Sequence, residues 1–192
     1  MKKITGSIVA IVTPMHNDCS LDRTSLNKLI EWHIQAGTDG IVVVGTTGES
    51  PTVDFDEHIE LIKFATEIVD GRVAVFAGTG ANSTDEAISL TKEAEQIGVD
   101  ASLQVTPYYN KPSQRGIIEH FSKIADATSL PIILYNVPGR TVADLNNESV
   151  KELSRHSNII GIKDATGYLN RGQWLIKELS NNFKIYSGDD PT

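Results

Sequence analysis

The chain has 192 residues, of which 40% are apolar and 22% charged, with a formal net charge of −8 and a pI near 5.1. A chain of this length builds one sizeable hydrophobic core, and this composition is typical of a globular protein. The acidic balance excludes a nucleic-acid-binding protein that depends on a broad basic surface. The single cysteine, Cys19, excludes a scaffold built on intrachain disulfides.

The first fifteen residues, MKKITGSIVAIVTPM, place two lysines before a short apolar run. The run is broken by Thr13 and Pro14 and has no small-residue cleavage site, so it predicts a first β-strand rather than a signal peptide. No stretch approaches the roughly 18 apolar residues that a membrane-spanning helix requires. We therefore expect a cytoplasmic protein that binds neither membrane nor nucleic acid.

Short apolar runs typical of buried strands alternate along the chain with longer segments of helical spacing. The expected strands are 7–12, 41–44, 73–77, 101–105, 131–135, 159–163 and 183–187. The first three helices are marked by Leu26, Leu29, Ile30 and Ile34, by Ile59, Ile62, Ala65 and Val69, and by Ala87, Leu90, Ala94 and Ile97. Gly37 and Gly98 fall where a helix commonly ends on a left-handed residue.

This alternation predicts an α/β fold whose parallel sheet is covered by helices. A doubly wound sheet and a (β/α)8 barrel, or TIM barrel, both fit the pattern. A complete barrel takes about 250 residues. For a barrel we therefore expect truncation after strand seven, without the eighth strand and the C-terminal helices. No linker is visible, so we expect residues 1–192 to form a single incomplete barrel domain.

In parallel α/β folds, functional side chains gather at the carboxyl ends of the strands. Polar and aromatic residues follow five of the predicted strands. These segments are Gly45–Ser50, Thr106–Pro112, Tyr135–Thr141, Ile162–Gly167 and Ser187–Asp190. We expect the candidate site among them.

Lys163 lies within the apolar strand 159–163. Burial disfavours the ammonium form, and so lowers the pKa of such a lysine. A neutral lysine amine can attack a ketone carbonyl and form an imine. The alternative is a lysine that extends to solvent or pairs with Asp164. The residues at the neighbouring strand ends favour the imine.

Three of the five tyrosines, Tyr108, Tyr109 and Tyr135, lie at two adjacent strand ends. Tyrosine hydroxyls relay protons when they align with another hydroxyl, which Thr46 or Thr47 would supply. Aromatic packing beneath loops is the alternative for each tyrosine alone. Their convergence opposite a strand lysine favours a proton relay.

The turn Gly45–Gly48 offers hydroxyl and backbone N–H groups that suit a carboxylate. It is no P-loop, because no Lys-Ser or Lys-Thr pair follows, and a plain tight turn is the alternative. Arg140 lies on a predicted loop after Pro138 and Gly139, and its guanidinium can bind a carboxylate through two hydrogen bonds. A solvated arginine is the alternative there.

The histidines show no paired metal-ligand spacing, and no glycine-rich dinucleotide motif is present. They are His16, His33, His58, His120 and His156. The sequence therefore predicts neither a metal site nor an organic cofactor.

Seven strings resemble the dihydrodipicolinate synthase family, of the pyruvate-dependent N-acetylneuraminate lyase superfamily, in order and spacing. They are GSIVAIVTPM, GTTGES, GTGAN, TPYYNKPSQ, YNVPGRT, GIKDATG and SGDD. The resemblance covers the chain from about Thr5 onward. It implies a (β/α)8 barrel and a class I, Schiff-base aldolase-type lyase. Such an enzyme condenses pyruvate with L-aspartate 4-semialdehyde, towards diaminopimelate and lysine, without a cofactor.

By this resemblance, Lys163 forms the imine with pyruvate, and Thr47 holds the pyruvate carboxylate. Tyr135 transfers protons and is linked through Thr46 to Tyr109. Each of these roles is carried over from the family onto the matching position of this chain.

The resemblance also implies that Arg140 binds the carboxylate of the semialdehyde and that Gly188 is a substrate-binding residue. Family members are homotetramers, built as dimers of dimers. The residue matching Tyr109 reaches the site of the neighbouring subunit, so we expect activity to depend on a dimer.

In family members that lysine inhibits, the inhibitor site uses positions that match five polar residues of this chain. These are Ser50, His58, Asn82, Glu86 and Tyr108. A further position, often histidine in inhibited members, matches Phe55. The resemblance thus implies a lysine-feedback site with weaker or altered inhibition.

Two alternatives stay open. Another pyruvate-imine lyase, such as N-acetylneuraminate lyase or a keto-deoxy-sugar aldolase, shares the fold and the lysine but usually lacks a counterpart of Gly139–Thr141. An alternative of a different class is a non-catalytic fragment of the synthase, because the family's C-terminal third is missing from this chain.

Overall fold

The computed structural model describes residues 4–191 and divides into two compact units. The first unit comprises the chain up to Thr79 together with Glu93–Ser102, and the second comprises Gly80–Lys92 and the chain from Leu103 onward. Helix α3 (Thr84–Ile97) begins in the second unit and ends in the first. Strand β4 (Ala101–Val105) begins in the first unit and ends in the second.

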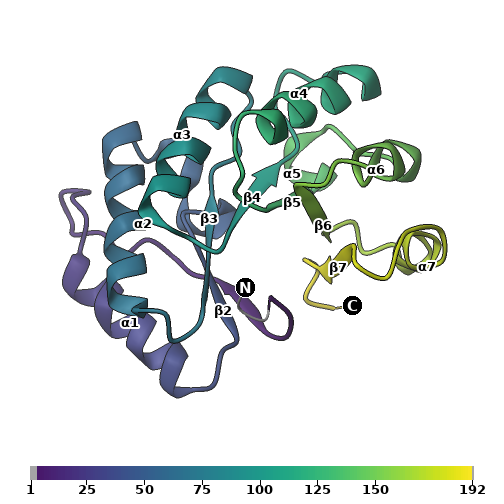
Figure 1. Cartoon of the computed structure of the whole chain (residues 1–192). Helices are drawn as coiled ribbons and strands as arrows, with labels where there is room; N and C mark the ends of the chain where they lie inside the picture. The colour runs from purple at the N-terminus through teal and green to yellow at the C-terminus, as the bar shows by residue number, and fades with distance from the viewer. Residues whose placement is uncertain (1–3, 192) are drawn as a thin grey trace. The chain divides into compact units, whose positions relative to one another are not determined.

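The first unit is a parallel sheet flanked by two helices (Figure 1). Its elements are β1 (Ile8–Ala10), α1 (Arg23–Gln35), β2 (Gly40–Val43), η1 (Thr46–Gly48), η2 (Ser50–Thr52), α2 (Phe55–Val69) and β3 (Ala74–Gly78). Ile8 lies opposite Gly40 in the β1–β2 pair, and Gly40 lies opposite Ala74 in the β2–β3 pair. Strands β2 and β3 are buried along their whole length, which explains their unbroken apolar runs.

Local capping decides where the helices of the first unit begin and end. The Asp22 carboxylate accepts a hydrogen bond from the Ser25 amide at 2.9 Å and so caps the start of α1. Gly37 and Gly98 follow α1 and α3 with φ of 84° and 89°. These values confirm the predicted left-handed residues, which favour glycine because it has no Cβ.

The second unit repeats the pattern of strand and helix. Its complete elements are α4 (Gln114–Asp126), β5 (Ile132–Asn136), α5 (Pro138–Thr141), α6 (Asn147–Leu153), β6 (Ile159–Asp164), α7 (Leu169–Glu178) and β7 (Lys184–Ser187). Strand β6 pairs in parallel with β5 on one side and β7 on the other. Phe121 and Ile124 of α4 and Leu134 of β5 are fully buried in the core of this unit. Burying each such side chain stabilises the fold by about 1.5–3 kcal/mol.

All seven predicted strands are present, and their ends lie within two residues of the predicted bounds. The prediction of a single domain over residues 1–192 stays a prediction. Among the helices of the described residues, none combines the length and the apolar character needed to span a bilayer.

His120 is a buried titratable group in the second unit. Its side chain lies on α4 and is 5% exposed, and its Nδ1 lies 2.9 Å from the Thr84 hydroxyl. Its Nε2 has no hydrogen-bond partner among the described residues. Burial lowers the pKa of His120 from 6.5 to about 4, because an imidazolium here would lose its hydration.

We predict that His120 makes the free energy of unfolding fall as the pH drops from 6.5 to about 4. In this window the unfolded chain binds a proton at His120 and the folded chain does not, so stability decreases on acidification. The full effect is about 3 kcal/mol, from about 1.4 kcal/mol per pKa unit. Urea denaturation of wild type and His120→Phe at pH 7, 5.5 and 4 measures it as the difference between the two proteins.

The matched control is His16→Gln, because His16 is more than half exposed. It should keep the pH dependence of the wild type. Parallel pH profiles for wild type and His120→Phe would contradict the prediction.

Candidate active site

Lys163 and Tyr135 face each other at the carboxyl ends of β6 and β5. They are register partners in the parallel pair, and the Lys163 Nζ lies 4.5 Å from the centroid of the Tyr135 ring. Tyr135 is 7% exposed. Burial lowers the pKa of Lys163, and the Asp190 carboxylate opposes this shift without cancelling it. The lowering predicted from the apolar strand is thus confirmed, and a larger fraction of the amine is neutral at a given pH.

Gly188, just after β7, leaves room for the Lys163 side chain. A Cβ at this position would lie 2.6 Å from the Lys163 Cε and 3.0 Å from its Cγ. The Gly188 amide also donates a hydrogen bond to the Asp164 carbonyl at 2.8 Å. Any larger residue here would displace the lysine stem.

Arg140 lies on a short helix and not on the predicted loop. Pro138 occupies the first turn of α5, where its fixed φ suits a helix and its missing N–H leaves no bond unmade. The Val137 carbonyl accepts hydrogen bonds from the amides of Arg140 and Thr141 at 2.9 and 3.0 Å. The Arg140 side chain is exposed on this turn. The guanidinium is therefore carried by hydrogen-bonded backbone and is open to a ligand.

Asn82, Glu86 and Tyr108 lie close together in the second unit. The Asn82 side chain donates to the Tyr108 carbonyl at 3.4 Å. Burial raises the pKa of Tyr108, and the nearby Glu86 carboxylate adds to the shift. Three of the five residues expected at a lysine-feedback site are thus neighbours.

Tyr109 differs from the other two strand-end tyrosines. Its side chain is 89% exposed, and its φ of 69° is in the left-handed region. Positive φ is uncommon in a residue with a Cβ, and it turns this side chain away from the packed interior. Within one chain Tyr109 is therefore directed into solvent, unlike Tyr135, and its part in a proton relay stays a prediction.

Thr46 and Thr47 lie in the first unit, where they open the 3₁₀-helix η1. The Gly48 amide donates to the Gly45 carbonyl at 2.9 Å, and the Thr13 hydroxyl donates to the Gly48 carbonyl at 2.7 Å. Thr47 is exposed and Thr46 is half-buried. The first N–H groups of a helical turn have no partner within it, so this turn presents hydroxyls and amides that suit an anion.

The turn is preceded by a strained residue. Val44 is 1% exposed and has a φ of 50°, which is an outlier for a β-branched residue. Such strain persists only where the surrounding structure imposes it. The burial of Val44 thus supports the sharp change of direction that sets Thr46 and Thr47.

His58 and Ser50 complete the predicted lysine-feedback residues, and both belong to the first unit. His58 is 3% exposed, and its Nε2 lies 2.8 Å from the Gly78 carbonyl, so this nitrogen carries the proton. Burial lowers the pKa of His58, and the Gly78 carbonyl opposes the shift. Ser50 begins η2 and is half-buried.

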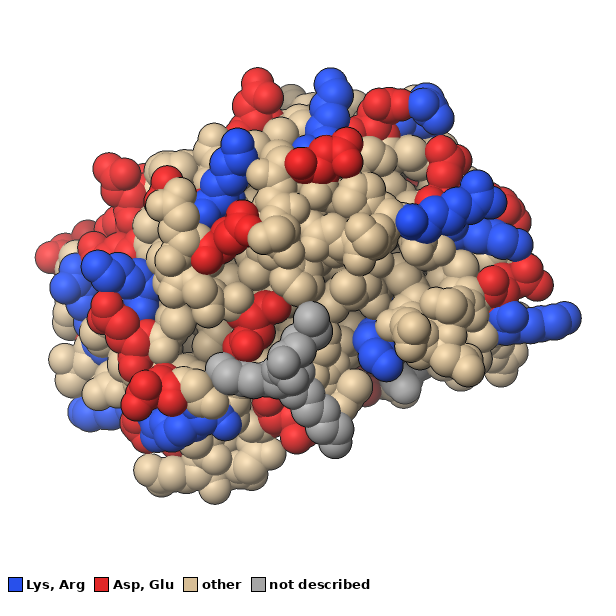
Figure 2. Space-filling view, viewed as in Figure 1, with Lys and Arg blue, Asp and Glu red and all other residues tan. Residues whose placement is uncertain are grey.

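Within residues 4–191, no group of three or more histidine, cysteine, aspartate or glutamate side chains could hold a metal ion. Figure 2 shows acidic and basic side chains interspersed over the face that it displays. That face carries no continuous basic surface of the kind used to bind nucleic acid.

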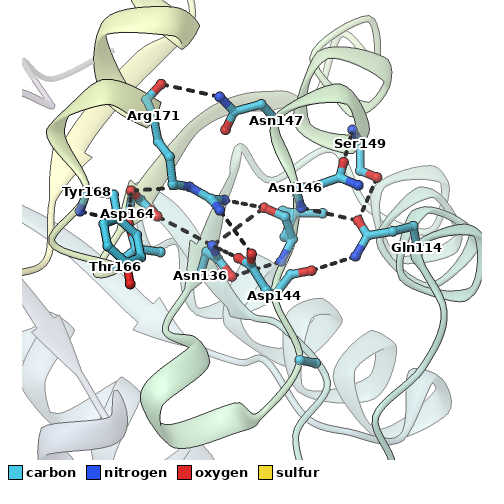
Figure 3. A network of polar contacts seen from close by, with 12 residues as sticks. Gln114, Asn136, Asp144, Asn146, Asn147, Ser149, Asp164, Thr166, Tyr168 and Arg171 are labelled. Carbon is cyan, nitrogen blue, oxygen red and sulfur yellow. Dashed lines mark hydrogen bonds and ion pairs between the residues drawn. The ribbon is translucent and has the colours of Figure 1, made fainter.

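Sequence reasoning gave no role to Asn136 or Arg171, although both belong to the network of polar contacts in Figure 3. Asn136 is fully buried next to Tyr135, and the side chain of Arg171 is 18% exposed. The one signal in the sequence was a polar residue, Asn136, at the end of an otherwise apolar strand. Nothing in the sequence indicated that Arg171 on α7 reaches Asp144 and Leu145, which Asn136 also contacts.

A family model, the dihydrodipicolinate synthetase family, matches residues 3–192. The 4-hydroxy-tetrahydrodipicolinate synthases of Methylibium petroleiphilum and Ralstonia nicotianae are 60% and 59% identical over 192 residues. Each match covers the whole chain, and 66% and 65% of the respective relative. The chain thus spans about two thirds of the length of these relatives.

Solved structures of dihydrodipicolinate synthases are similar to this chain as well. The chloride-inhibited, pyruvate-bound dihydrodipicolinate synthase of Acinetobacter baumannii superposes with a TM-score of 0.96 at 55% identity, over 98% of this chain and 65% of that one. The lysine-bound enzyme of Cyanidioschyzon merolae gives 0.93 at 40% identity, over 96% and 64%. These matches confirm the predicted α/β barrel-type fold. The chain belongs to the dihydrodipicolinate synthetase family.

Proposed function

We propose that the chain acts as a 4-hydroxy-tetrahydrodipicolinate synthase, which condenses pyruvate with L-aspartate 4-semialdehyde through a Schiff base on Lys163. One observation carries the proposal. A strand lysine with a pKa lowered by burial holds its Nζ 4.5 Å from the centre of the Tyr135 ring. A neutral amine in dry surroundings is the nucleophile that imine formation needs. The pyruvate bound by the Acinetobacter baumannii enzyme supports the choice of keto acid.

Imine formation begins when the neutral Lys163 amine attacks the ketone carbon of pyruvate. The new carbon–nitrogen bond replaces the carbonyl π bond, and the oxygen takes a proton. A second proton transfer lets this oxygen leave as water and gives the protonated imine. We assign these transfers to the Tyr135 hydroxyl, with Thr46 and Tyr109 of the partner subunit as its relay.

The protonated imine then makes the carbon–carbon bond. Its positive nitrogen withdraws electrons from the former methyl group of pyruvate, which loses a proton and becomes an enamine. The enamine carbon attacks the aldehyde carbon of the second substrate, and the aldehyde oxygen takes up a proton. The imine is itself the electron sink, so the reaction as written uses neither a metal nor an organic cofactor.

Two anionic groups need binding sites in this reaction. We assign the pyruvate carboxylate to Thr47, together with the amides at the start of η1. We assign the carboxylate of the semialdehyde to Arg140, whose exposed guanidinium can form two parallel hydrogen bonds with it. Gly188 completes the substrate-binding residues by leaving space beside Lys163.

We further propose a cytoplasmic homotetramer, built as a dimer of dimers. An aromatic side chain that is 89% exposed, as Tyr109 is, suits a residue that reaches into the site of a partner subunit. Activity would then depend on at least a dimer.

Borohydride reduction in the presence of pyruvate should attach one pyruvate to the chain, at Lys163. The reason is that only a neutral, accessible amine forms the imine that borohydride traps. Peptide mass spectrometry locates the adduct. Lys163→Ala should abolish it.

Lys184→Ala is the matched control, since Lys184 lies on the neighbouring strand β7 and should leave labelling unchanged. An adduct on any other lysine would refute the assignment. Condensation assays with pyruvate and a panel of aldehydes separate this synthase from sugar-acid lyases: aspartate semialdehyde should be preferred.

Gly188→Ala should slow trapping by about 100-fold while leaving the urea midpoint nearly unchanged. The added methyl would lie 2.6 Å from the Lys163 Cε, and a displacement of about 1 Å at a reacting group costs about that factor. Gly172→Ala on α7 is the control, because a Cβ added there would have nothing within 4 Å of it. Equal trapping rates in Gly188→Ala and wild type would show that the lysine stem does not depend on this space.

We also propose that lysine regulates the chain through Ser50, His58, Asn82, Glu86 and Tyr108. The lysine-bound relative from Cyanidioschyzon merolae supports this ligand. Glu86 is an exposed carboxylate next to Tyr108, and it suits the ammonium group of an amino acid.

Calorimetric titration with L-lysine tests the regulatory site. Glu86→Gln should weaken binding by at least about tenfold, because a charge-assisted hydrogen bond contributes about 1.5–3 kcal/mol. Asp85→Asn, one residue away on the exposed side of α3, should bind like the wild type. No heat of binding and unchanged rates at millimolar lysine would rule the site out.

A further inference from the structure

The ends of β5 and β6 carry two pairs of register partners that point to opposite faces of the sheet. Tyr135 faces Lys163, and one residue further on Asn136 faces Asp164. Because side chains alternate along a strand, the second pair lies on the side away from the lysine amine. Whatever fixes Asn136 and Asp164 therefore also fixes the backbone that carries Tyr135 and Lys163.

Asn136 ties the end of β5 to the segment that precedes α6. Its side chain is fully buried, and its Nδ2 donates to the Asp144 carboxylate at 2.8 Å. Its Oδ1 accepts a hydrogen bond from the Leu145 amide at 3.0 Å. The same Nδ2 lies 3.4 Å from the Asp164 carboxylate, and the Asn136 carbonyl accepts from the Ala165 amide at 2.8 Å. Asn136 thus contacts both strand ends.

Arg171 of α7 contacts the same segment and the end of β6 (Figure 3). Its Nη1 donates to the Asp144 carboxylate at 3.0 Å, and its Nη2 donates to the Leu145 carbonyl at 2.6 Å. Its Nε lies 3.9 Å from the Asp164 carboxylate. One guanidinium therefore joins α7, the segment before α6 and the end of β6. A planar fork can do this, whereas a point-charge ammonium cannot make all three contacts at once.

We infer that Arg171 is a positioning residue for imine formation, which acts through Asp144, Asn136 and Asp164 to hold Lys163 opposite Tyr135. The inference rests on the proposed function. It assigns no substrate contact to Arg171, which works on the opposite face of the sheet from the amine. Effective attack requires the reacting atoms to be placed within a fraction of an ångström. The contacts of Arg171, Asp144 and Asn136 restrain the strand ends that carry Lys163 and Tyr135, from the opposite face of the sheet.

Arg171 also pairs with the carboxylate that follows the lysine, because its Nε lies 3.9 Å from Asp164. The titratable groups around Lys163 in the second unit are its register partners Tyr135 on β5 and Tyr186 on β7, Asp164 on its own strand, and Asp190 after β7. Removing the guanidinium would leave the Asp164 carboxylate without its cation. An unpaired carboxylate stabilises a nearby ammonium and so raises the pKa of Lys163.

The experiment compares Arg171→Gln and Arg171→Lys with wild type by borohydride trapping of pyruvate on the 192-residue chain. The trapping rate is measured against pyruvate concentration and against pH. For Arg171→Gln we expect the maximal rate to fall by at least about tenfold, with the half-saturating pyruvate concentration changed by less than about twofold. Its pH profile should move to higher pH. Arg171→Lys keeps the charge, so it should trap slowly with the pH profile of the wild type.

Lys151→Gln is the matched control, because the pair of Lys151 with Glu178 at 2.9 Å also joins α6 to α7 but lies outside this network. It should change neither the rate nor the pH profile. A merely structural role for Arg171 would lower the folded fraction seen by circular dichroism without shifting the pH profile of the folded molecules.

If Arg171→Gln does not fold, the trapping rate of Asp144→Ala is measured instead, because this variant removes the carboxylate that accepts from Arg171 and leaves the guanidinium in place. Wild-type rates and pH profiles in the folded variants would overturn the inference. A wild-type chain that forms no adduct at all would instead overturn the proposed function.

Discussion

The parallel pairing of β5 with β6 is the constraint on which the candidate chemistry depends. This register sets Tyr135 opposite Lys163 on one face of the sheet and Asn136 opposite Asp164 on the other. The register is fixed by strand residues that are buried, such as Leu134 and Ile162. A slip of β6 by one residue would turn Lys163 to the face that carries Asn136 and away from Tyr135.

Burial and charge act in opposite directions on the lysine. Loss of hydration lowers the pKa of Lys163, and the Asp190 carboxylate partly restores it. An amine that is fully protonated could not attack a carbonyl. An amine without any nearby negative charge would gain little stabilisation for the positive imine that follows. A partly buried lysine with one carboxylate near it meets both requirements, because the same surroundings serve the neutral nucleophile and the cationic intermediate.

The strands, the helix ends and the lowered pKa of Lys163 could be predicted from the sequence, because each depends on residues close together in the chain. The apolar runs that predicted the strands are strands of the structure, and Gly37 and Gly98 end helices with positive φ. The lowered pKa of Lys163 followed from its apolar neighbours alone. What the sequence did not indicate depends on backbone detail. The left-handed φ of Tyr109 and its exposure have no signal in the neighbouring residues.

The turn that carries Arg140 is a second feature that the sequence did not predict, because it is a short helix and not a loop. The proline before it marks a helix start as well as a loop, and the two cannot be told apart over four residues. The contacts of Arg171 with Asp144 and Leu145 span 27 and 26 residues of sequence. Pairings at that separation follow from how α7 packs and have no signature in composition or spacing.

The ion pair between Arg171 and Asp164 bears on the charge next to Lys163. An aspartate directly after Lys163 would favour the ammonium form of this lysine if the charge of the aspartate were unopposed. Asp164 is nevertheless useful there, because it accepts hydrogen bonds from Asn136 and from the Thr166 hydroxyl, the latter at 2.8 Å, and so fixes the strand end. A guanidinium 3.9 Å away offsets the charge and leaves these bonds intact. In the positioning role that we infer, Arg171 would let the Asp164 carboxylate fix the position of Lys163 without favouring its ammonium form.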